Sequence, residues 1–222
     1  NQYETQAMEQ ILTQRGHVER SWDEPCDAYI INTCTVTAVS DKKSRNMIRR
    51  VRRQNPAAVV AVCGCYAQVE PEAVEALDVD VVAGTGGRVA FLDAVEAAVS
   101  EKRRSFAVDD ALRRRTFEVL PAGGMAERTR AMLKVQDGCS NFCTYCIIPY
   151  ARGPVRSLPL EEAVAQAREV AQAGYREMVV TGIEISSWGR DLPEKPPLWK
   201  LLAAICESAP AVRVRLGSLE PR

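Results

Sequence analysis

Short apolar runs alternate with amphipathic segments in the first half of the chain. Runs of strand length occupy residues 28–32, 59–63 and 79–83, and each predicts a buried strand. Apolar residues recur at helical spacing over 2–15, 41–53 and 88–100, with Asp41 as the expected cap of the second helix, and a further helix follows Pro71. This alternation predicts a parallel sheet with helices on both faces.

The same alternation begins again at residue 131. Strands are expected over 131–135, 178–181 and 212–216, with helices near 160–173 and 197–207. The pattern is typical of a β/α barrel, whose chemistry lies at the carboxyl ends of the strands. Three such strands are too few to close a barrel, so we expect the chain to be a fragment.

The predicted fold class is therefore α/β, in two domains. A parallel-sheet domain covers 1–100, a charged linker with room for one added strand covers 101–130, and the first half of a barrel covers 131–222. No apolar run approaches the roughly 20 residues of a membrane span, and the first residues do not resemble a signal peptide. We expect a cytoplasmic protein with no membrane partner.

Charge is informative only in its distribution, because 29 basic residues balance 29 acidic ones. Basic residues gather in three clusters that suit phosphate contacts, although a solvated helix face or linker explains each cluster equally well. The clusters are Lys42, Lys43, Arg45, Arg49, Arg50, Arg52 and Arg53, then Lys102, Arg103 and Arg104, then Arg113, Arg114 and Arg115.

Eight cysteines in a chain of cytosolic character indicate metal ligands before disulfides. Cys139, Cys143 and Cys146 have a C-x3-C-x2-C spacing, which lets one short loop bind three corners of an iron–sulfur cluster through soft thiolates. No fourth cysteine lies close by, so one iron would stay open to a small molecule. Zinc is disfavoured, because its structural sites add a second cysteine pair or histidines and the only histidine is His17.

Cys34 and Cys65 each follow a predicted strand. Because parallel strands end at the same edge of a sheet, we expect both thiols at that edge, where functional loops gather. Cys63 precedes Cys65 by two residues and is interpreted as a small buried apolar residue, with a spare metal ligand as the alternative.

Three motifs resemble those of one family. Residues 138–153, with Arg156 and Ser157, resemble the radical S-adenosylmethionine (SAM) methylthiotransferases, and residues 32–37 and 64–68 resemble the N-terminal domain of that family. Residues 134–139, 181–184 and 216–221 resemble the branch that adds a methylthio group to C2 of N6-threonylcarbamoyladenosine at tRNA position 37, beside the anticodon. The alternatives are a branch acting on isopentenyladenosine tRNA or a ribosomal protein, a cobalamin-dependent radical-SAM enzyme, and a non-catalytic iron–sulfur redox module.

The resemblance implies two [4Fe–4S] clusters, SAM, a tRNA substrate and an electron donor such as flavodoxin or ferredoxin. The first cluster, on Cys139, Cys143 and Cys146, would cleave SAM; the auxiliary cluster, on Cys34 and Cys65 with a third ligand expected just upstream of Asn1, would supply sulfur. No other catalytic residue is implied. The cofactor-binding residues would be Tyr145, Gly182, Glu184 and Ser218, and the substrate-binding residues Arg152, Arg156 and Glu220.

Overall fold

The computed structural model describes residues 2–22, 24–122 and 130–220, which form two compact units. The first unit comprises residues 12–112 and 143–152, and the second comprises residues 2–11, 113–142 and 153–222. Residues 123–129 of the predicted linker lie outside the described part of the chain.

The first unit is built on a fully parallel four-stranded sheet. Its strands lie in the sequence order β1-β2-β3-β4. They span Ala28–Thr33 (β1), Val59–Gly64 (β2), Val81–Ala83 (β3) and Ser105–Ala107 (β4). Every residue of β2 and β3 is buried, as expected of parallel strands that are covered on both faces.

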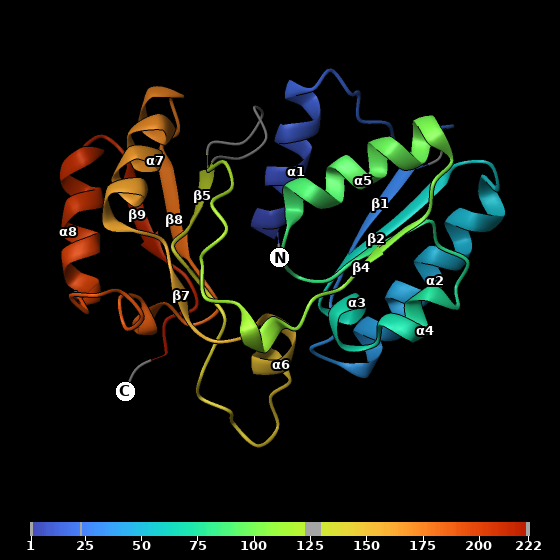
Figure 1. Ribbon diagram of the computed structural model, residues 1–222. Coiled ribbons are helices and arrows are strands. Elements are labelled where there is room, and N and C mark those ends of the chain that lie inside the picture. The colour runs from blue at the N-terminus through green and yellow to red at the C-terminus, as the bar shows by residue number, and fades with distance from the viewer. Residues whose placement is uncertain (1, 23, 123–129, 221–222) are drawn as a thin grey trace. The chain divides into compact units, whose positions relative to one another are not determined.

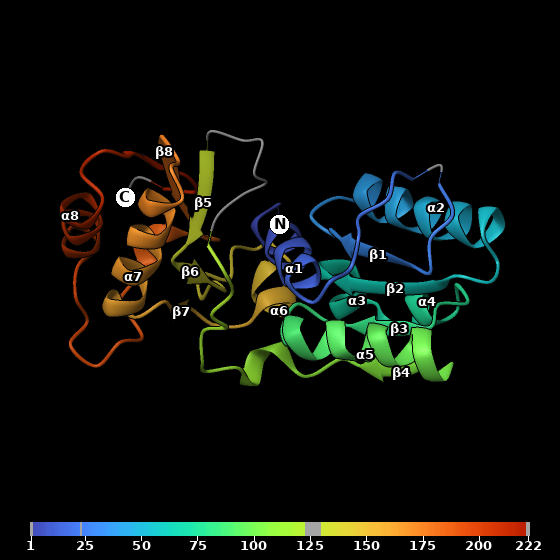
Figure 2. The same ribbon diagram turned by 90° about the horizontal axis from the view of Figure 1, so that it is seen from above.

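Helices cover both faces of this sheet. Helix α2 (Ala38–Gln54) and helix α5 (Arg88–Glu101) lie on opposite sides of it (Figures 1 and 2). Ile48 and Val51 of α2 pack with alternate residues of β1 and β2, in a core that also holds Val74 of α4 (Pro71–Glu75). Two further short helices complete the unit, α3 (Cys65–Val69) and α6 (Ile148–Arg152), and these two contact each other.

The second unit contains a parallel three-stranded sheet in the order β5-β8-β9 and a two-stranded antiparallel pair, β6-β7. The strands span Arg130–Lys134 (β5), Gln136–Asp137 (β6), Arg156–Ser157 (β7), Glu177–Thr181 (β8) and Arg213–Leu216 (β9). Helices α7 (Leu160–Gln172) and α8 (Leu198–Ser208) pack together and enclose a core with the sheet. The short 3-10 helix η2 (Ile185–Ser187) follows β8, and η1 (Ala111–Arg113) belongs to the connection between the units.

Helix α1 (Gln2–Gln14) begins in the second unit. Tyr3 and Ala7 pack against Leu120, and the Tyr3 hydroxyl donates to the Leu120 carbonyl at 2.7 Å. Burial, with the nearby charges of Glu4 and Glu118, raises the pKa of Tyr3, so the phenol stays protonated and keeps this hydrogen bond.

The structure confirms the α/β class and the parallel sheets, and corrects two details. Helix α2 begins at Ala38, because the Thr37 side chain accepts from the Ser40 N–H at 3.1 Å; the predicted cap Asp41 lies inside the first turn. Short elements were not predicted: α3, α6 and the β6-β7 pair. None of the described helices has the length and apolar content that crossing a membrane requires.

Gly64 lets β1 and β2 approach closely at their carboxyl ends. Its φ is +100°, and a Cβ atom there would lie 2.6 Å from Asn32 Oδ1 and would also overlap the Thr33 carbonyl oxygen. The register continues to the last pair, Thr33 opposite Gly64, so the next residues of both strands, Cys34 and Cys65, leave the sheet side by side.

We predict that Gly64→Ala lowers the free energy of unfolding by about 1–3 kcal/mol or more, since it adds overlap to an unfavourable φ. Urea unfolding followed by circular dichroism measures this loss. Gly16→Ala is the matched control, because Gly16 has a φ of +91° with nothing within 4 Å of its added Cβ. Equal losses in the two variants would contradict the close-approach explanation.

Candidate functional site

The three-cysteine segment begins on a tightly held turn in the second unit. Strand β6 ends at Asp137, and Gly138 follows with a φ of +71°. The Cys139 N–H donates to the Gly153 carbonyl at 3.0 Å, and a Cβ on Gly138 would lie 2.6 Å from that same oxygen. Glycine at 138 is therefore required for Cys139 to start from a fixed backbone position.

The three thiols differ in exposure. Cys139 and Cys146 are half-buried and Cys143 is exposed, and none of them is in a disulfide. Cys146 donates its N–H to the Cys143 carbonyl at 2.9 Å, which forms a turn between them. Within residues 2–22, 24–122 and 130–220, no three His, Cys, Asp or Glu side chains are arranged to hold a metal ion. The cysteine ligand assignments therefore stay a prediction, based on donor chemistry and spacing.

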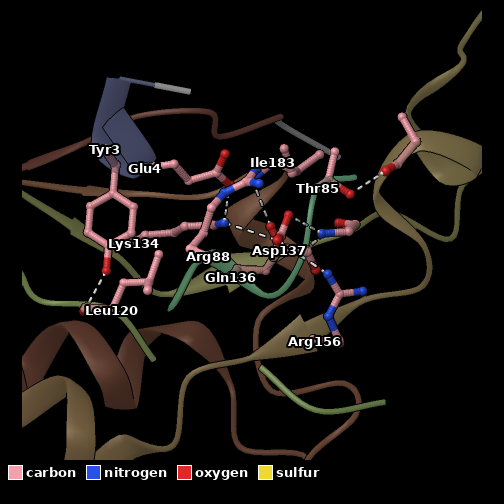
Figure 3. A network of polar contacts seen from close by, with 12 residues as sticks. Tyr3, Glu4, Thr85, Arg88, Leu120, Lys134, Gln136, Asp137, Arg156 and Ile183 are labelled. Carbon is pink, nitrogen blue, oxygen red and sulfur yellow. Dashed lines mark hydrogen bonds and ion pairs between the residues drawn. The ribbon is translucent and has the colours of Figure 1, made fainter. Parts of the chain in front are cut away.

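Gln136 joins the start of the cysteine segment to the loop that follows β8. Its side chain is fully buried. Oε1 accepts from the N–H groups of Ile183 and Glu184, both at 2.9 Å, and Nε2 donates to the carbonyls of Asp137 and Gly138 at 2.9 and 2.6 Å (Figure 3). One amide thus fixes two loops at the carboxyl edge of the sheet.

Gly182 makes this connection possible. A Cβ at residue 182 would lie 2.7 Å from Gln136 Oε1 and 2.8 Å from the Gln136 carbonyl oxygen. Any larger residue would push the two loops apart. This close contact gives Gly182 a structural role. Its cofactor-binding role stays a prediction.

Asp137 lies at the centre of a buried charge network. Oδ2 is 3.0 Å from Lys134 Nζ and 3.2 Å from Arg156 Nη2, and Oδ1 accepts from the Gly138 N–H at 2.8 Å (Figure 3). Lys134 also pairs with Glu4 of α1 at 2.8 Å. The Asp137 carboxylate is therefore paired with cations, as a buried charge requires.

Glu184 is buried, with an exposed fraction of 5%. Oε1 accepts from the Ser186 N–H at 3.0 Å and caps η2, whereas Oε2 is buried and has no hydrogen-bond partner among the described residues. A buried carboxylate oxygen without a donor is costly, and a hydrogen-bond donor such as an ammonium group would satisfy it.

The predicted residue Ser218 lies on the loop after β9. It has a φ of +59°, and its carbonyl accepts from the Ile185 N–H at 3.1 Å. The Gly217 N–H in turn donates to the Val180 carbonyl at 2.9 Å. The loops after β8 and β9 are therefore held together at the carboxyl edge.

The other predicted residues have contrasting environments. Tyr145 is 90% exposed, so its ring is available to a ligand. Arg152 and Arg156 are both buried, at 3% exposure, so neither is a surface charge. Arg156 is held by Asp137 and by the Pro154 carbonyl at 2.8 Å. Glu220 is exposed at the end of the described chain.

The first unit has its own cysteine pair at the carboxyl edge of its sheet. Cys34 is half-buried directly after β1, and Cys65 is 4% exposed as the first residue of α3. Thr33 ties these strand ends together, because its hydroxyl donates to the Cys63 carbonyl at 2.6 Å. Cys63 is fully buried within β2, which agrees with its interpretation as a small buried apolar residue.

Residues 143–152 also belong to the first unit. The Thr85 hydroxyl, just beyond β3, donates to the Ala151 carbonyl at 2.6 Å. Thr85 is positioned by Gln68, whose Oε1 accepts from the Thr85 N–H at 3.0 Å. The sequence motif around Cys65, which includes Gln68, thus positions the residues that follow Cys146.

Gln136 and Asp137 are the residues that the sequence analysis missed as site residues. They belong to the 134–139 motif, so the resemblance marked the segment without giving either residue a role. The hydrogen-bond partners of Gln136 at residues 183 and 184 are 47 and 48 positions away, and no local pattern reports such a contact.

We predict that Gln136→Leu destabilises the fold by at least about 2 kcal/mol, because it leaves several buried backbone groups without partners. Urea unfolding gives the free energy. Gln166→Leu is the control: Gln166 is buried in the same unit but makes one side-chain hydrogen bond, to Leu120, and its Oε1 is unpartnered. A loss no larger than that of the control would overturn the bridging role of Gln136.

Two family models match the chain in succession. Residues 1–84 match the uncharacterized protein family UPF0004, and residues 133–221 match the radical SAM superfamily. Among solved structures, the chain resembles the radical S-adenosylmethionine methyltransferase TsrM from Kitasatospora setae, with a TM-score of 0.56 and 17% identity over 96% of this chain and 52% of that one. At this identity the likeness shows the fold alone.

Curated relatives match the whole chain. The threonylcarbamoyladenosine tRNA methylthiotransferase MtaB of Bacillus subtilis is 42% identical over 222 residues, and MtaB of Aquifex aeolicus is 37% identical over 220. A tRNA-2-methylthio-N(6)-dimethylallyladenosine synthase of Carboxydothermus hydrogenoformans is 31% identical over 229. These matches include 99–100% of this chain but only 49–53% of each relative, so the chain spans about half the length of these relatives. By the order of its two matched families and by these relatives, the chain belongs to the radical-SAM methylthiotransferase family and resembles MtaB.

Proposed function

We propose that the protein of which this chain is part adds a methylthio group to C2 of N6-threonylcarbamoyladenosine in tRNA. The observation that carries this proposal is 42% identity with Bacillus subtilis MtaB across both units. The identity with the dimethylallyladenosine synthase is lower, at 31%, and disfavours that substrate. A ribosomal-protein substrate and a non-catalytic iron–sulfur module gain no support from these relatives.

Cys139, Cys143 and Cys146 would hold the first [4Fe–4S] cluster. Their thiols are free, and thiolate sulfur is the donor that iron–sulfur clusters use. When bound, such a cluster would supply the reductive cleavage of SAM to a carbon radical, which is reactive enough to remove hydrogen from an unactivated aromatic C–H. The protein's task is to orient SAM, and the rigid start of the segment at Gly138 suits that task.

Glu184 would receive the ammonium group of SAM. Its unpartnered Oε2 is a buried acceptor of the required charge, and its backbone is fixed by Gln136. Gly182 keeps the neighbouring loop close, Ser218 lies on the next loop, and the exposed Tyr145 is available to the adenine. These four residues are our proposed SAM contacts.

Cys34 and Cys65 would hold part of the auxiliary [4Fe–4S] cluster. They follow paired residues of adjacent strands, so their backbones are close, and neither is in a disulfide. Such a site would bring the sulfur source to the carboxyl edge of the first sheet.

The tRNA substrate would be bound in part through Arg152, Arg156 and Glu220, and an electron donor such as flavodoxin or ferredoxin would reduce the clusters. We also propose a cytoplasmic location without a membrane partner, which a tRNA substrate favours.

The proposed activity is tested with tRNA that carries threonylcarbamoyladenosine but no methylthio group. The reconstituted full-length protein, a reductant and SAM should convert this nucleoside to its 2-methylthio derivative, detected by mass spectrometry of digested tRNA. Conversion of isopentenyladenosine alone would move the protein to the sister branch, and unchanged tRNA of both kinds would refute the proposal.

We predict that Glu184→Gln weakens SAM binding by about 10- to 100-fold, the value of a hydrogen bond to a charged group. The dissociation constant is obtained by titrating SAM into the anaerobically reconstituted, reduced chain and following the cluster signal by electron paramagnetic resonance. Glu194→Gln, at an exposed position of the same unit, should bind SAM as the wild type does. Unchanged affinity in Glu184→Gln would remove this residue from the SAM site.

A further inference from the structure

Helix α1 belongs to one family in sequence and to the unit of the other family in space. The N-terminal family model matches residues 1–84, and the radical SAM match begins only at residue 133. Residues 2–11 nevertheless form part of the second unit, where an apolar cluster around Tyr3 packs against Met132 of β5. The start of α1 is therefore a component of the unit that carries the radical SAM match.

Glu4 of this helix is a buried charge that is paired with Lys134. The exposed fractions of the two side chains are 3% and 12%, and Glu4 Oε1 lies 2.8 Å from Lys134 Nζ, across 130 positions of sequence. A buried ion pair is weak evidence for stability, because apolar side chains of similar size often hold an interface equally well. Apolar contacts around Tyr3 already hold α1 to this unit. The pair is therefore better explained by what it positions, which is the Lys134 ammonium group.

Lys134 also contacts the residue that leads into the cysteine segment. Its Nζ lies 3.0 Å from Asp137 Oδ2, so one ammonium group donates to two carboxylates (Figure 3). The centre of the Phe117 ring lies 5.9 Å from the same nitrogen, a distance that allows a cation–π contact. Contacts with Glu4, Phe117 and Asp137 thus fix the position of the ammonium group.

Asp137 connects the ammonium group to the backbone just before Cys139. Its Oδ2 faces Lys134, while its Oδ1 accepts from the Gly138 N–H at 2.8 Å. Arg156 lies 3.2 Å from the same Oδ2. A carboxylate is planar and rigid, so a rotation that breaks the contact at one oxygen also moves the other oxygen. The position of the Gly138 peptide group therefore depends on Lys134 staying in place.

We propose that Glu4 is a positioning residue for the radical-SAM site. By holding Lys134, and through it Asp137, Glu4 fixes the backbone from which the Cys139 thiol would reach the cluster. This role rests on the proposed function, because it takes Cys139 as a ligand of the cluster that cleaves SAM. Loss of the Glu4 charge should loosen the start of the cysteine segment without removing any cluster ligand.

Hydrogen–deuterium exchange of the full-length protein without clusters tests the structural step. The variant Glu4→Gln keeps the size of the side chain and removes its charge. We expect the amide hydrogens of Gly138 and Cys139 to exchange at least about tenfold faster in this variant than in the wild type, because a contact between charged groups is lost. Mass spectrometry of peptides that cover residues 136–142 measures the exchange rate.

SAM binding to the reconstituted, reduced full-length protein tests the functional step, with the cluster signal followed by electron paramagnetic resonance. We expect the dissociation constant to rise by about 3- to 30-fold in Glu4→Gln, the range for a residue that acts through others. Lys134→Met should also raise it, and adding Glu4→Gln to Lys134→Met should raise it no further. Additive effects would mean that Glu4 acts by another route and would overturn its positioning role. If Lys134→Met does not fold, the Glu4→Gln result decides alone.

Tyr3→Phe is the matched control on the same helix. It removes the hydrogen bond to the Leu120 carbonyl and leaves the Glu4–Lys134 pair in place. Its free energy of unfolding in urea should fall, while its exchange at Cys139 and its SAM affinity should equal those of the wild type. Circular dichroism checks that every variant is folded. Equal effects of Tyr3→Phe and Glu4→Gln on SAM affinity would assign the effect to the packing of α1 and would overturn the role of Glu4.

The role of Glu4 and the radical-SAM assignment fail in different ways. A wild-type protein whose cluster signal does not respond to SAM would refute the assignment, and the role of Glu4 with it. A wild type that responds, beside a Glu4→Gln variant of equal SAM affinity, would refute the role of Glu4 alone. In that case, faster exchange at Cys139 would leave Glu4 a structural residue of the second unit.

Discussion

Parallel strand pairing is the constraint on which both candidate sites depend. In a parallel sheet every strand ends at the same edge, so residues far apart in sequence leave the sheet together. The register that ends with Thr33 opposite Gly64 brings Cys34 and Cys65 to one edge of the first sheet. In the second, the pairing of β5, β8 and β9 gathers the residues that lead to Cys139, the Glu184 loop and the Ser218 loop. The candidate site residues lie on loops, but the sheets decide where those loops begin.

Buried hydrogen bonds and ion pairs then fix the positions of the loops at this shared edge. Hydrophobic packing alone does not set the position of a loop to a fraction of an ångström, because apolar contact is not directional. Gln136 supplies direction, with an acceptor for two N–H groups of one loop and donors for two carbonyls of the other. Asp137 adds ion pairs with Lys134 and Arg156. Glu184 Oε2 differs from these groups, because it is buried without a hydrogen-bond partner among the described residues.

Elements with a repeating pattern of apolar residues could be predicted from the sequence, whereas short elements without such a pattern could not. The strand over 59–63 was recognisable because a strand covered on both faces is apolar throughout, and the α7 region because its apolar stripe persists over several turns. Helices α3 and α6 have five residues each, too few for a period. The predicted start of α2 was too late, for two reasons. Thr37 and Asp41 are both good capping residues, and Val39 is exposed where a polar residue was expected. The cysteines were predicted as metal ligands from their spacing and from the resemblance. The bridging role of Gln136 could be seen only in the folded chain.

Helix α2 shows how structure decides between two meanings of the same residue type. In the sequence its seven cations form one cluster, for which a solvated face and a phosphate site were equally good explanations. The fold decides this for two of them: Arg45 contacts Tyr66, and Arg52 contacts Asp78 and Asp80, so both serve the structure of the first unit.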